Sequence, residues 1–161
     1  MKLTLLDKDS LEHTIYLSDM LVKFQEEVFG SDTEIDIDTF IKYHFAIYLA
    51  IIDGECIGFT SFVINSYYGL REPTIGNDYI YIVKGHRRSR AMHLFSLQSG
   101  KVCIENNLPL EHYIASESSD RLSKRLSGKK IFTAYIYEVE EVERVFNKLK
   151  TKVRIKNEDI Q

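Results

Sequence analysis

The chain has 161 residues, of which 44% are hydrophobic and 28% are charged, and its net charge is −3. These values are typical of a single globular domain and exclude general disorder, a collagen-like fibre and a coiled-coil rod. No apolar run approaches the roughly 20 residues that a membrane-spanning helix needs, and acidic residues near the start argue against a secretion signal. Cys56 and Cys103 have the spacing of neither a disulfide framework nor a metal site, so we expect buried thiols and a cytoplasmic protein.

The charge is distributed unevenly along the chain. Residues 1–83 contain 5 Lys/Arg and 14 Asp/Glu, a balance of −9, whereas residues 84–161 contain 16 and 10, a balance of +6. Two explanations stay open: the C-terminal half faces an anionic partner, or the two halves attract each other in the fold.

The first part of the chain is predicted to contain a strand and a helix. A short strand is expected over residues 2–6. Apolar residues then recur at helical spacing from residue 11 to residue 29. Ser10 has the character of a helix cap, and Gly30 of a helix end.

A second short helix, over about residues 39–45, is expected to begin after Asp38. The pattern then changes to strands. Two apolar runs, 46–52 and 55–64, flank an Asp-Gly pair, which is a strong signal for a β-hairpin.

The middle of the chain predicts a strand, a basic turn and a helix. Residues 67–76 are expected to form a loop, and 77–83 a buried strand. The basic turn KGHRRS leads into a predicted helix over 89–106.

The last part of the chain predicts alternating strands and helices. The expected elements are a strand over 110–116, a helix over 119–127, a strand over 131–139, a charged helix over about 140–150 and a polar tail. This order indicates an α/β (α+β) mixed sheet with helices on both faces. The strand–helix–strand unit over 77–116 should be a right-handed parallel crossover. We expect a single domain over 1–150 and a basic tail over 151–161.

The basic turn is the most informative segment. Four cationic side chains, Lys84, Arg87, Arg88 and Arg90, lie within seven residues, where a strand passes into a helix. The first amides of a helix have no partners inside the helix, and its dipole favours negative charge there. The segment therefore predicts an anion site that suits a pyrophosphate, with a solvated basic turn as the alternative.

This segment resembles the cofactor-binding motif of the GNAT N-acetyltransferase superfamily, a strand V-x-P-x-x-R-G-x-G-x-G followed by a helix. Ile82 falls on the valine and Arg87 on the arginine, whereas Arg88, Arg90 and Met92 replace the three glycines. The string RRSRA also resembles a variant found in acetyltransferase-like proteins of tailed phages.

Two further motifs extend the resemblance over about residues 45–139. The stretch 119–132 is similar to the family pattern S-N-x-x-A-x-x-L-Y-x-K-x-G-F, and the predicted hairpin is similar to the family's D-G-x-x-V-G. The matching residues are Ser119, Leu126, Lys129 and Phe132 in the first, and Asp53, Gly54 and Gly58 in the second.

The resemblance implies a GNAT-like mixed sheet of about six to seven strands flanked by helices. It also implies that acetyl-CoA binds between two splayed parallel strands, here 77–83 and 110–116. The residues that would hold acetyl-CoA are Tyr81, Ile82, Arg87, Arg88, Ser89, Arg90, Ala91, Met92 and Asp120.

The implied chemistry is acetyl transfer to an amine, with no metal. Asp78, which opens the central strand, is the candidate base, with a structural turn aspartate as the alternative. Ser127 replaces the family's tyrosine acid, and it is either a residue that positions water for the leaving group or a structural residue.

Three functions remain open. The first is an acyl-CoA-dependent N-acyltransferase, most simply an acetyltransferase acting on a primary amine of a small molecule or a protein. The second is a catalytically inert binding or structural protein with this fold, of phage origin, supported by the missing glycines and tyrosine. The third, a nucleic-acid-binding module, is disfavoured because the acidic half would repel the backbone. No membrane partner is expected, and a homodimer stays open.

Overall fold

The computed structural model describes residues 1–30, 34–66, 73–113, 129–131, 134–137 and 139–153. Its contacts divide the chain into two compact units. Among the described residues, the first unit consists of Met1–Phe62 and Tyr79–Phe95, and the second of Val63–Asp78 and the described part of Ser96–Ile155.

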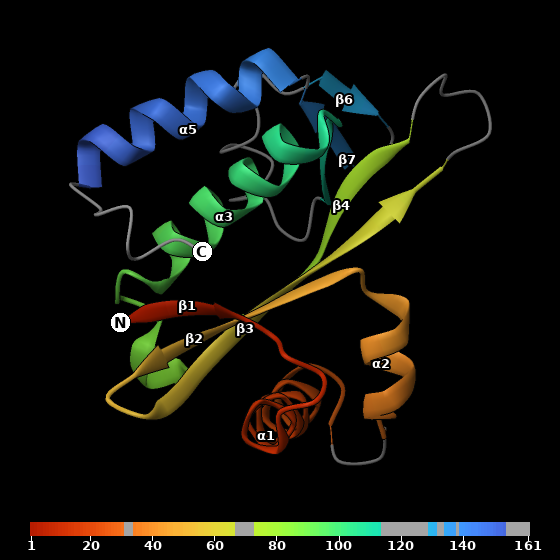
Figure 1. The fold of residues 1–161 in the computed structure, drawn as a ribbon, viewed down its shortest axis with the longest axis vertical. Coiled ribbons are helices and arrows are strands. Elements are labelled where there is room, and N and C mark those ends of the chain that lie inside the picture. Colours follow the sequence, from red (N-terminus) through yellow and green to blue (C-terminus); the bar gives the residue numbers. More distant parts are fainter. Residues whose placement is uncertain (31–33, 67–72, 114–128, 132–133, 138, 154–161) are drawn as a thin grey trace. The chain divides into compact units, whose positions relative to one another are not determined.

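A mixed sheet of seven strands runs through the described residues, in the order β1-β2-β3-β4-β5-β7-β6 (Figure 1). The strands are β1 (Lys2–Leu5), β2 (Ala46–Ile52), β3 (Glu55–Asn65), β4 (Thr74–Ile82), β5 (Leu110–Tyr113), β6 (Lys129–Ile131) and β7 (Ala134–Tyr137). β4 and β5 pair in parallel, whereas β1–β2, β2–β3, β5–β7 and β6–β7 pair antiparallel. The mixed α/β fold class predicted from the sequence is confirmed.

The described helices are α1 (Leu11–Val28), α2 (Ile37–Tyr43), the 3-10 helix η1 (Lys84–His86), α3 (Ala91–Asn106) and α5 (Val139–Val153). None of these described helices is long and apolar enough to cross a membrane. α3 connects β4 to its parallel neighbour β5, as expected for a strand–helix–strand crossover.

Helix α1 has the ends that its sequence predicts. The Ser10 hydroxyl oxygen accepts a hydrogen bond from the His13 amide at 3.3 Å, which satisfies a first-turn donor. Beyond the last turn, Gly30 has a φ of +83°, a conformation that favours glycine and stops the helix. One face of α1 buries Leu17, Met20, Leu21 and Phe24.

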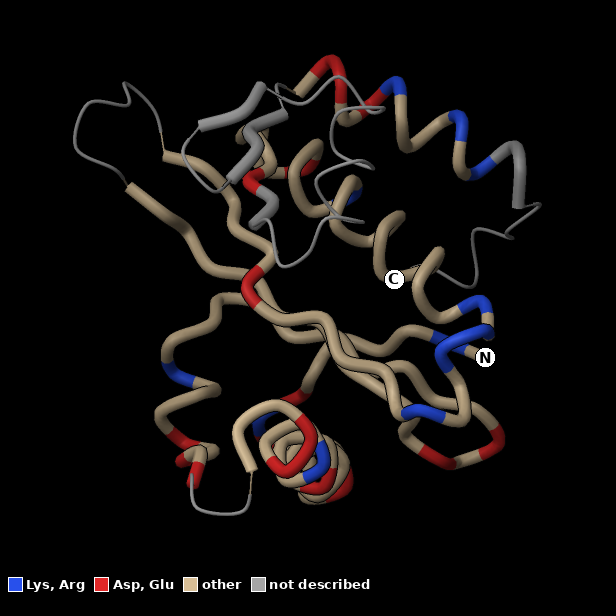
Figure 2. Tube along the Cα trace, turned by 180° about the vertical axis from the view of Figure 1, so that it is seen from behind, with Lys and Arg blue, Asp and Glu red and all other residues tan. Residues whose placement is uncertain are grey.

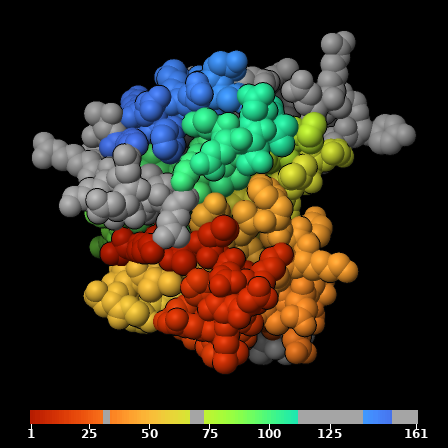
Figure 3. Space-filling model, in the orientation of Figure 1, coloured from red at the N-terminus to blue at the C-terminus, as the bar shows by residue number. Residues whose placement is uncertain are grey.

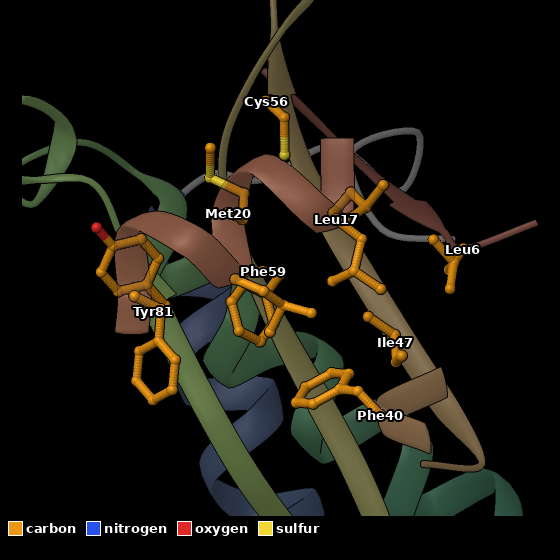
Figure 4. Packing of buried hydrophobic residues seen from close by; sticks show 11 residues of the cluster. Leu6, Leu17, Met20, Phe40, Ile47, Cys56, Phe59 and Tyr81 are labelled. Atoms are coloured by element: carbon orange, nitrogen blue, oxygen red, sulfur yellow. The ribbon is translucent and has the colours of Figure 1, made fainter. Parts of the chain in front are cut away.

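The core of the first unit is largely aromatic. Phe59 on β3 is fully buried, and its ring lies edge-on to Phe24 of α1 and Phe40 of α2, with centroids 6.1 and 5.8 Å away. Tyr81 of β4 completes the group at 6.2 Å (Figure 4). The two helices of this unit are therefore held by packing on β3 and β4. The buried cluster comprises Leu6, Leu17, Met20, Leu21, Phe24, Phe40, Ile47, Leu49, Cys56, Phe59 and Tyr81.

The predicted hairpin at Asp53-Gly54 is confirmed. Both residues have positive φ, 51° and 84°, as a two-residue turn between twisted strands requires. Farther along β3, a Cβ on Gly58 would lie 2.3 Å from the Tyr81 carbonyl oxygen and 3.1 Å from Ile82 Cα. Gly58 therefore allows β4 to lie close against β3 at the start of the basic turn.

Two expected element boundaries are wrong by a few residues. Helix α2 begins at Ile37 because Asp36, rather than Asp38, caps it, its carboxylate accepting from the Thr39 amide at 2.6 Å. Strand β4 begins at Thr74, inside the predicted loop 67–76. The strand is lengthened because the Ile75 amide donates to the Pro109 carbonyl at 2.8 Å.

The single strand expected over 131–139 is also wrong. Two short strands, β6 and β7, pair antiparallel there, with Ile131 opposite Ala134. Helix α5 runs to Val153, three residues into the expected tail. The helix predicted over 119–127 lies outside the described residues.

The second unit joins α3 and α5 at a glycine. A Cβ on Gly100 of α3 would lie 3.1 Å from the ring of Phe146 of α5, so the absence of a side chain lets the helices approach closely. Val142 of α5 is buried as well.

Candidate functional site

The basic turn between β4 and α3 is built from short backbone hydrogen bonds. The Val83 amide donates to the Ile57 carbonyl at 3.0 Å, which keeps the end of β4 on the sheet. The amides of His86 and Ser89 then donate to the carbonyls three residues earlier, both at 2.9 Å. These bonds fix the turn, and they also use donors that an anion would otherwise need.

Helix α3 starts immediately after this turn. Its first i→i−4 bond runs from the Leu94 amide to the Arg90 carbonyl at 3.0 Å, so the amides of Ala91, Met92 and His93 precede the regular ladder. The Ser89 hydroxyl accepts the Ala91 amide at 3.2 Å. Of the predicted phosphate ligands, Ser89 and Ala91 thus contact each other.

The cationic side chains of the turn are exposed. Lys84, Arg88 and Arg90 are all exposed, and they belong to the segment between β4 and α3. Figure 2 shows where Lys and Arg residues (blue) lie along the chain. Together with the start of α3, the three cations of this segment concentrate positive potential within one loop of the first unit. Met92, which stands where the family has its last glycine, is also exposed.

Arg87 is held differently from the other arginines. Its Nε donates to the Ile82 carbonyl at 3.0 Å, and its terminal nitrogen forms an ion pair with Glu27 of α1. The hydrogen bond from Arg87 lowers the pKa of Glu27. The Arg87 side chain therefore ties the end of β4 to the last turn of α1.

Tyr81 and Ile82, the predicted strand residues of the cofactor site, are both buried. The Tyr81 hydroxyl donates to the second oxygen of Glu27 at 3.4 Å, and burial raises the pKa of Tyr81. Glu27 thus joins two predicted site residues, a contact that no local sequence signal indicates because 60 positions separate Glu27 from Arg87.

In the second unit, the two parallel strands part soon after they meet. The pairing of β4 with β5 covers Ile75–Leu110 and Gly76–Glu111. Both strands continue for two more residues in this unit, β4 through Asp78 and β5 through Tyr113, beyond the last paired position. Asp78, the candidate base, is half-buried and follows the point where the pairing ends.

A buried carboxylate that sequence reasoning missed lies at this point. Glu111 is only 3% exposed, and one of its oxygens accepts from Asn65 Nδ2 and from the Thr74 hydroxyl, both at 3.0 Å. A Cβ on Gly76 would lie 2.5 Å from Asn65 Nδ2, so any larger residue there would displace the Asn65 side chain from its bond to Glu111. Neutral donors on β3 and β4 thereby fix β5 where the strands part. The signal in the sequence is one acidic residue, Glu111, inside a segment expected to form a strand of the central sheet.

Two predicted site residues, Ser127 and Asp120, lie outside the described residues.

The two cysteines are free and buried, as the sequence predicts. Burial raises the pKa of Cys56 to about 11 and that of Cys103 to about 12. Neither thiol therefore has the low pKa of a nucleophile. In the part of the chain that the structure describes, no group of His, Cys, Asp and Glu is placed to hold a metal ion.

No family model and no curated protein matches the sequence, but solved structures match the fold. A probable acetyltransferase is 18% identical with a TM-score of 0.61, over 81% of this chain and 91% of its own. A mutant of the toxin AtaT bound to the C-terminus of the antitoxin AtaR is 12% identical with a TM-score of 0.58, over 91% and 98%. An aminoglycoside N-acetyltransferase of Acinetobacter haemolyticus is 14% identical with a TM-score of 0.56, over 81% and 92%. The chain shares the fold of these acetyltransferases, as the resemblance of its motifs predicts.

Proposed function

We propose that the chain is an acyl-CoA-dependent N-acyltransferase that transfers acetyl from acetyl-CoA to a primary amine by direct attack. The observation that carries this proposal is the early end of the β4–β5 pairing in the second unit, after Gly76 and Glu111. Two parallel strands whose pairing ends early correspond to the splayed strands between which the GNAT resemblance implies that acetyl-CoA binds. A similar structure, that of AtaTR, was solved with acetyl-CoA bound, with a TM-score of 0.56 and 12% identity.

The basic turn of the first unit fits the phosphates of CoA. Arg88, Arg90 and Lys84 are exposed cations next to the first turn of α3. Arginine pairs with phosphate through two parallel N–H donors, and a helix start adds favourable potential. Tyr81 and Ile82 would supply strand backbone, and Asp120 stays a prediction for the pantetheine arm.

Bound acetyl-CoA would supply the acyl group as a reactive thioester. An amine attacks only when it is neutral, and a free lysine-type amine has a pKa of about 10.4, so a base must take its proton. We assign this role to Asp78, directly or through a water. The new N–C bond forms as the C–S bond breaks, and the thiolate leaves with its electron pair. A thiol pKa near 8.5 makes this leaving group adequate with only a water positioned by Ser127.

The acidic first half of the chain supports a cationic acceptor. Glu34, Asp36 and Asp38 lie before and within the start of α2, and Glu26 and Glu27 close α1. Their combined negative potential would raise the local concentration of an amine cation or a lysine-rich peptide.

A catalytically inert protein with the same fold is the second candidate. Two contacts favour it: Arg87 is paired with Glu27, and the Ala91 amide is capped by Ser89. Both use groups that the family motif assigns to phosphate.

The deciding experiment measures thiol release from acetyl-CoA with a panel of primary amines that includes polyamines, aminoglycosides and a lysine-rich peptide. Asp78→Asn should lower kcat at least about a hundredfold, since general base catalysis contributes that much or more. CoA binding by calorimetry should be unchanged. The matched control is Asp53→Asn, the same change at the exposed hairpin turn. Unchanged turnover in Asp78→Asn would remove this residue from the mechanism, and CoA binding without turnover of any amine would favour the inert protein.

A further inference from the structure

Helix α1 carries a second apolar stripe besides the face that it buries. Leu11, Ile15, Val22 and Phe29 are 76, 56, 51 and 54% exposed. With Ser18 and Gln25 between them, they follow a strict alternation of four and three residues, the spacing of a coiled-coil seam. In Figure 3, α1 (red) forms part of the surface facing the viewer.

Leu11, Ile15 and Val22 lie on a different line of the helix from the core face, whereas the Phe29 ring packs edge-on against the buried Phe24 ring, with centroids 5.7 Å apart. The buried residues of α1, Leu17, Met20, Leu21 and Phe24, follow another line along the helix. Helix α1 therefore has buried apolar side chains on one line and exposed apolar side chains on another. Two of the six positions along this line are polar, and the Gln25 side-chain oxygen accepts from the Ile35 amide at 3.0 Å. The four exposed apolar side chains on one line of a helix surface nevertheless indicate an interaction site.

A row of acidic residues runs along one side of the stripe. Glu12, Asp19 and Glu26 are spaced seven residues apart, so they occupy one flanking position of the seam, and all three are exposed. Asp19 also contacts Lys23 at 3.4 Å, and Glu12 accepts the Tyr16 hydroxyl at 2.8 Å. The last turn of α1 contains no basic residue, although cations are favoured at that end of a helix. Glu26 and Glu27 make this end acidic instead.

These charges indicate what covers the stripe. Two copies of α1 paired antiparallel about their midpoint would bring Asp19 close to its own counterpart, and the other acids of the row close together. Like charges placed opposite each other weaken an interface, so the row disfavours a second copy. A helix that bears lysine or arginine beside its own apolar seam would match both the seam and the row.

We propose that the stripe Leu11–Ile15–Val22–Phe29 is the docking surface for a basic amphipathic helix of a partner protein. The apolar seam supplies the buried area, and the acidic row supplies orientation and a salt-dependent association rate. None of the stripe residues belongs to the predicted cofactor or catalytic set, although Glu26 of the acidic row also contributes to the negative potential that we assign to the acceptor side.

The test uses a synthetic fluorescent peptide of three heptads, with leucine at both seam positions and lysine at both flanking positions. Its binding to the full chain is followed by fluorescence anisotropy at low and high salt. Val22→Glu should weaken binding at least about tenfold, although it adds an acid that a purely electrostatic contact would welcome. Lys23→Gln changes the net charge by the same amount next to the stripe, and it should bind the peptide as tightly as the wild type or more tightly. Circular dichroism of each variant verifies that α1 stays folded.

A second variant tests the acidic row alone and leaves the apolar stripe unchanged. Glu12→Gln combined with Glu26→Gln should weaken peptide binding and reduce its dependence on salt, with the stripe intact. The proposal would be overturned if Val22→Glu bound the lysine peptide as tightly as the wild type does. It would also be overturned if the wild type bound a glutamate-flanked peptide as tightly as the lysine peptide, or did not bind the lysine peptide at all. Sedimentation of the wild-type chain as a dimer that Val22→Glu converts to a monomer would also overturn it, since the occupant would then be a second copy.

Discussion

Among the described residues, the second unit of the chain buries a carboxylate and the first does not. In the first unit, the buried cluster is apolar and largely aromatic, and its ion pair between Glu27 and Arg87 lies at the surface. In the second, a carboxylate, an amide and a hydroxyl meet at Glu111, where the parallel strands part. Fully buried Gln98 of the second unit has no hydrogen-bond partner for its side-chain amide. The first unit also buries the polar residues His44, Thr60 and Ser61, but in the second unit the buried group is a carboxylate next to the proposed chemistry, which is costlier to bury.

The largest expected effect is on the aromatic core of the first unit. Phe59→Ala removes a fully buried ring that contacts Phe24, Phe40 and Tyr81. We expect a loss of about 3–5 kcal/mol in the free energy of unfolding, measured by urea denaturation. Val22→Ala, at an exposed site, should change it by less than about 1 kcal/mol. A loss of similar size in both variants would contradict the assignment of this core.

In the polar cluster of Glu111, Asn65 and Thr74, the loss of stability should depend on whether the substituted side chain can still accept hydrogen bonds, more than on its size. Glu111→Ala removes the acceptor of the buried Thr74 hydroxyl and of the half-buried Asn65 amide, at a cost of about 1–3 kcal/mol for the buried hydroxyl. Glu111→Gln keeps an acceptor oxygen and should lose less. Glu143→Ala, an exposed glutamate of α5, serves as the control. If glutamine is as harmful as alanine in urea denaturation, the carboxylate charge itself is what the site requires.

The smallest effect concerns the surface pair that ties α1 to the end of β4. Arg87 lowers the pKa of Glu27 in the folded chain, so the stability that the pair contributes is present above the unfolded pKa of about 4.3. It is lost as pH falls through the folded pKa. Glu27→Gln should therefore lower the urea midpoint at pH 7 but much less at pH 3. In an Arg87→Ala chain, the same substitution should lose most of this pH dependence, and a difference that stays constant from pH 7 to pH 3 would exclude the linkage.

Local signals predicted the elements that are determined locally. Ser10 and Gly30 marked the ends of α1, and Asp53-Gly54 marked the hairpin, because capping and positive φ depend on the residues themselves. The cap of α2 was misplaced by two residues because Asp36 and Asp38 are chemically equivalent caps. Only the fold decides which of them receives the amide.

The site was predictable in part for the same reason. The basic turn and the helix start after it follow from contiguous residues. The contacts of Glu27 with Arg87, and of Asn65 with Glu111, join residues 60 and 46 positions apart. Such contacts depend on strand order and register, which one sequence does not specify. Gly76, inside the segment expected to be a loop, is understood only once Asn65 is seen to lie against it.

The most direct test of the proposed function is calorimetric titration of the full chain with CoA, repeated on Arg88→Ala combined with Arg90→Ala. Arg144→Ala, an exposed arginine of α5, is the control for charge. We expect the wild type and the control to bind CoA, with a stabilisation of about 2.7 kcal/mol when the ligand is at 100 times its dissociation constant. The double variant should bind at least about tenfold more weakly. A wild-type chain that shows neither heat of binding nor thermal stabilisation with millimolar CoA would contradict the proposed function.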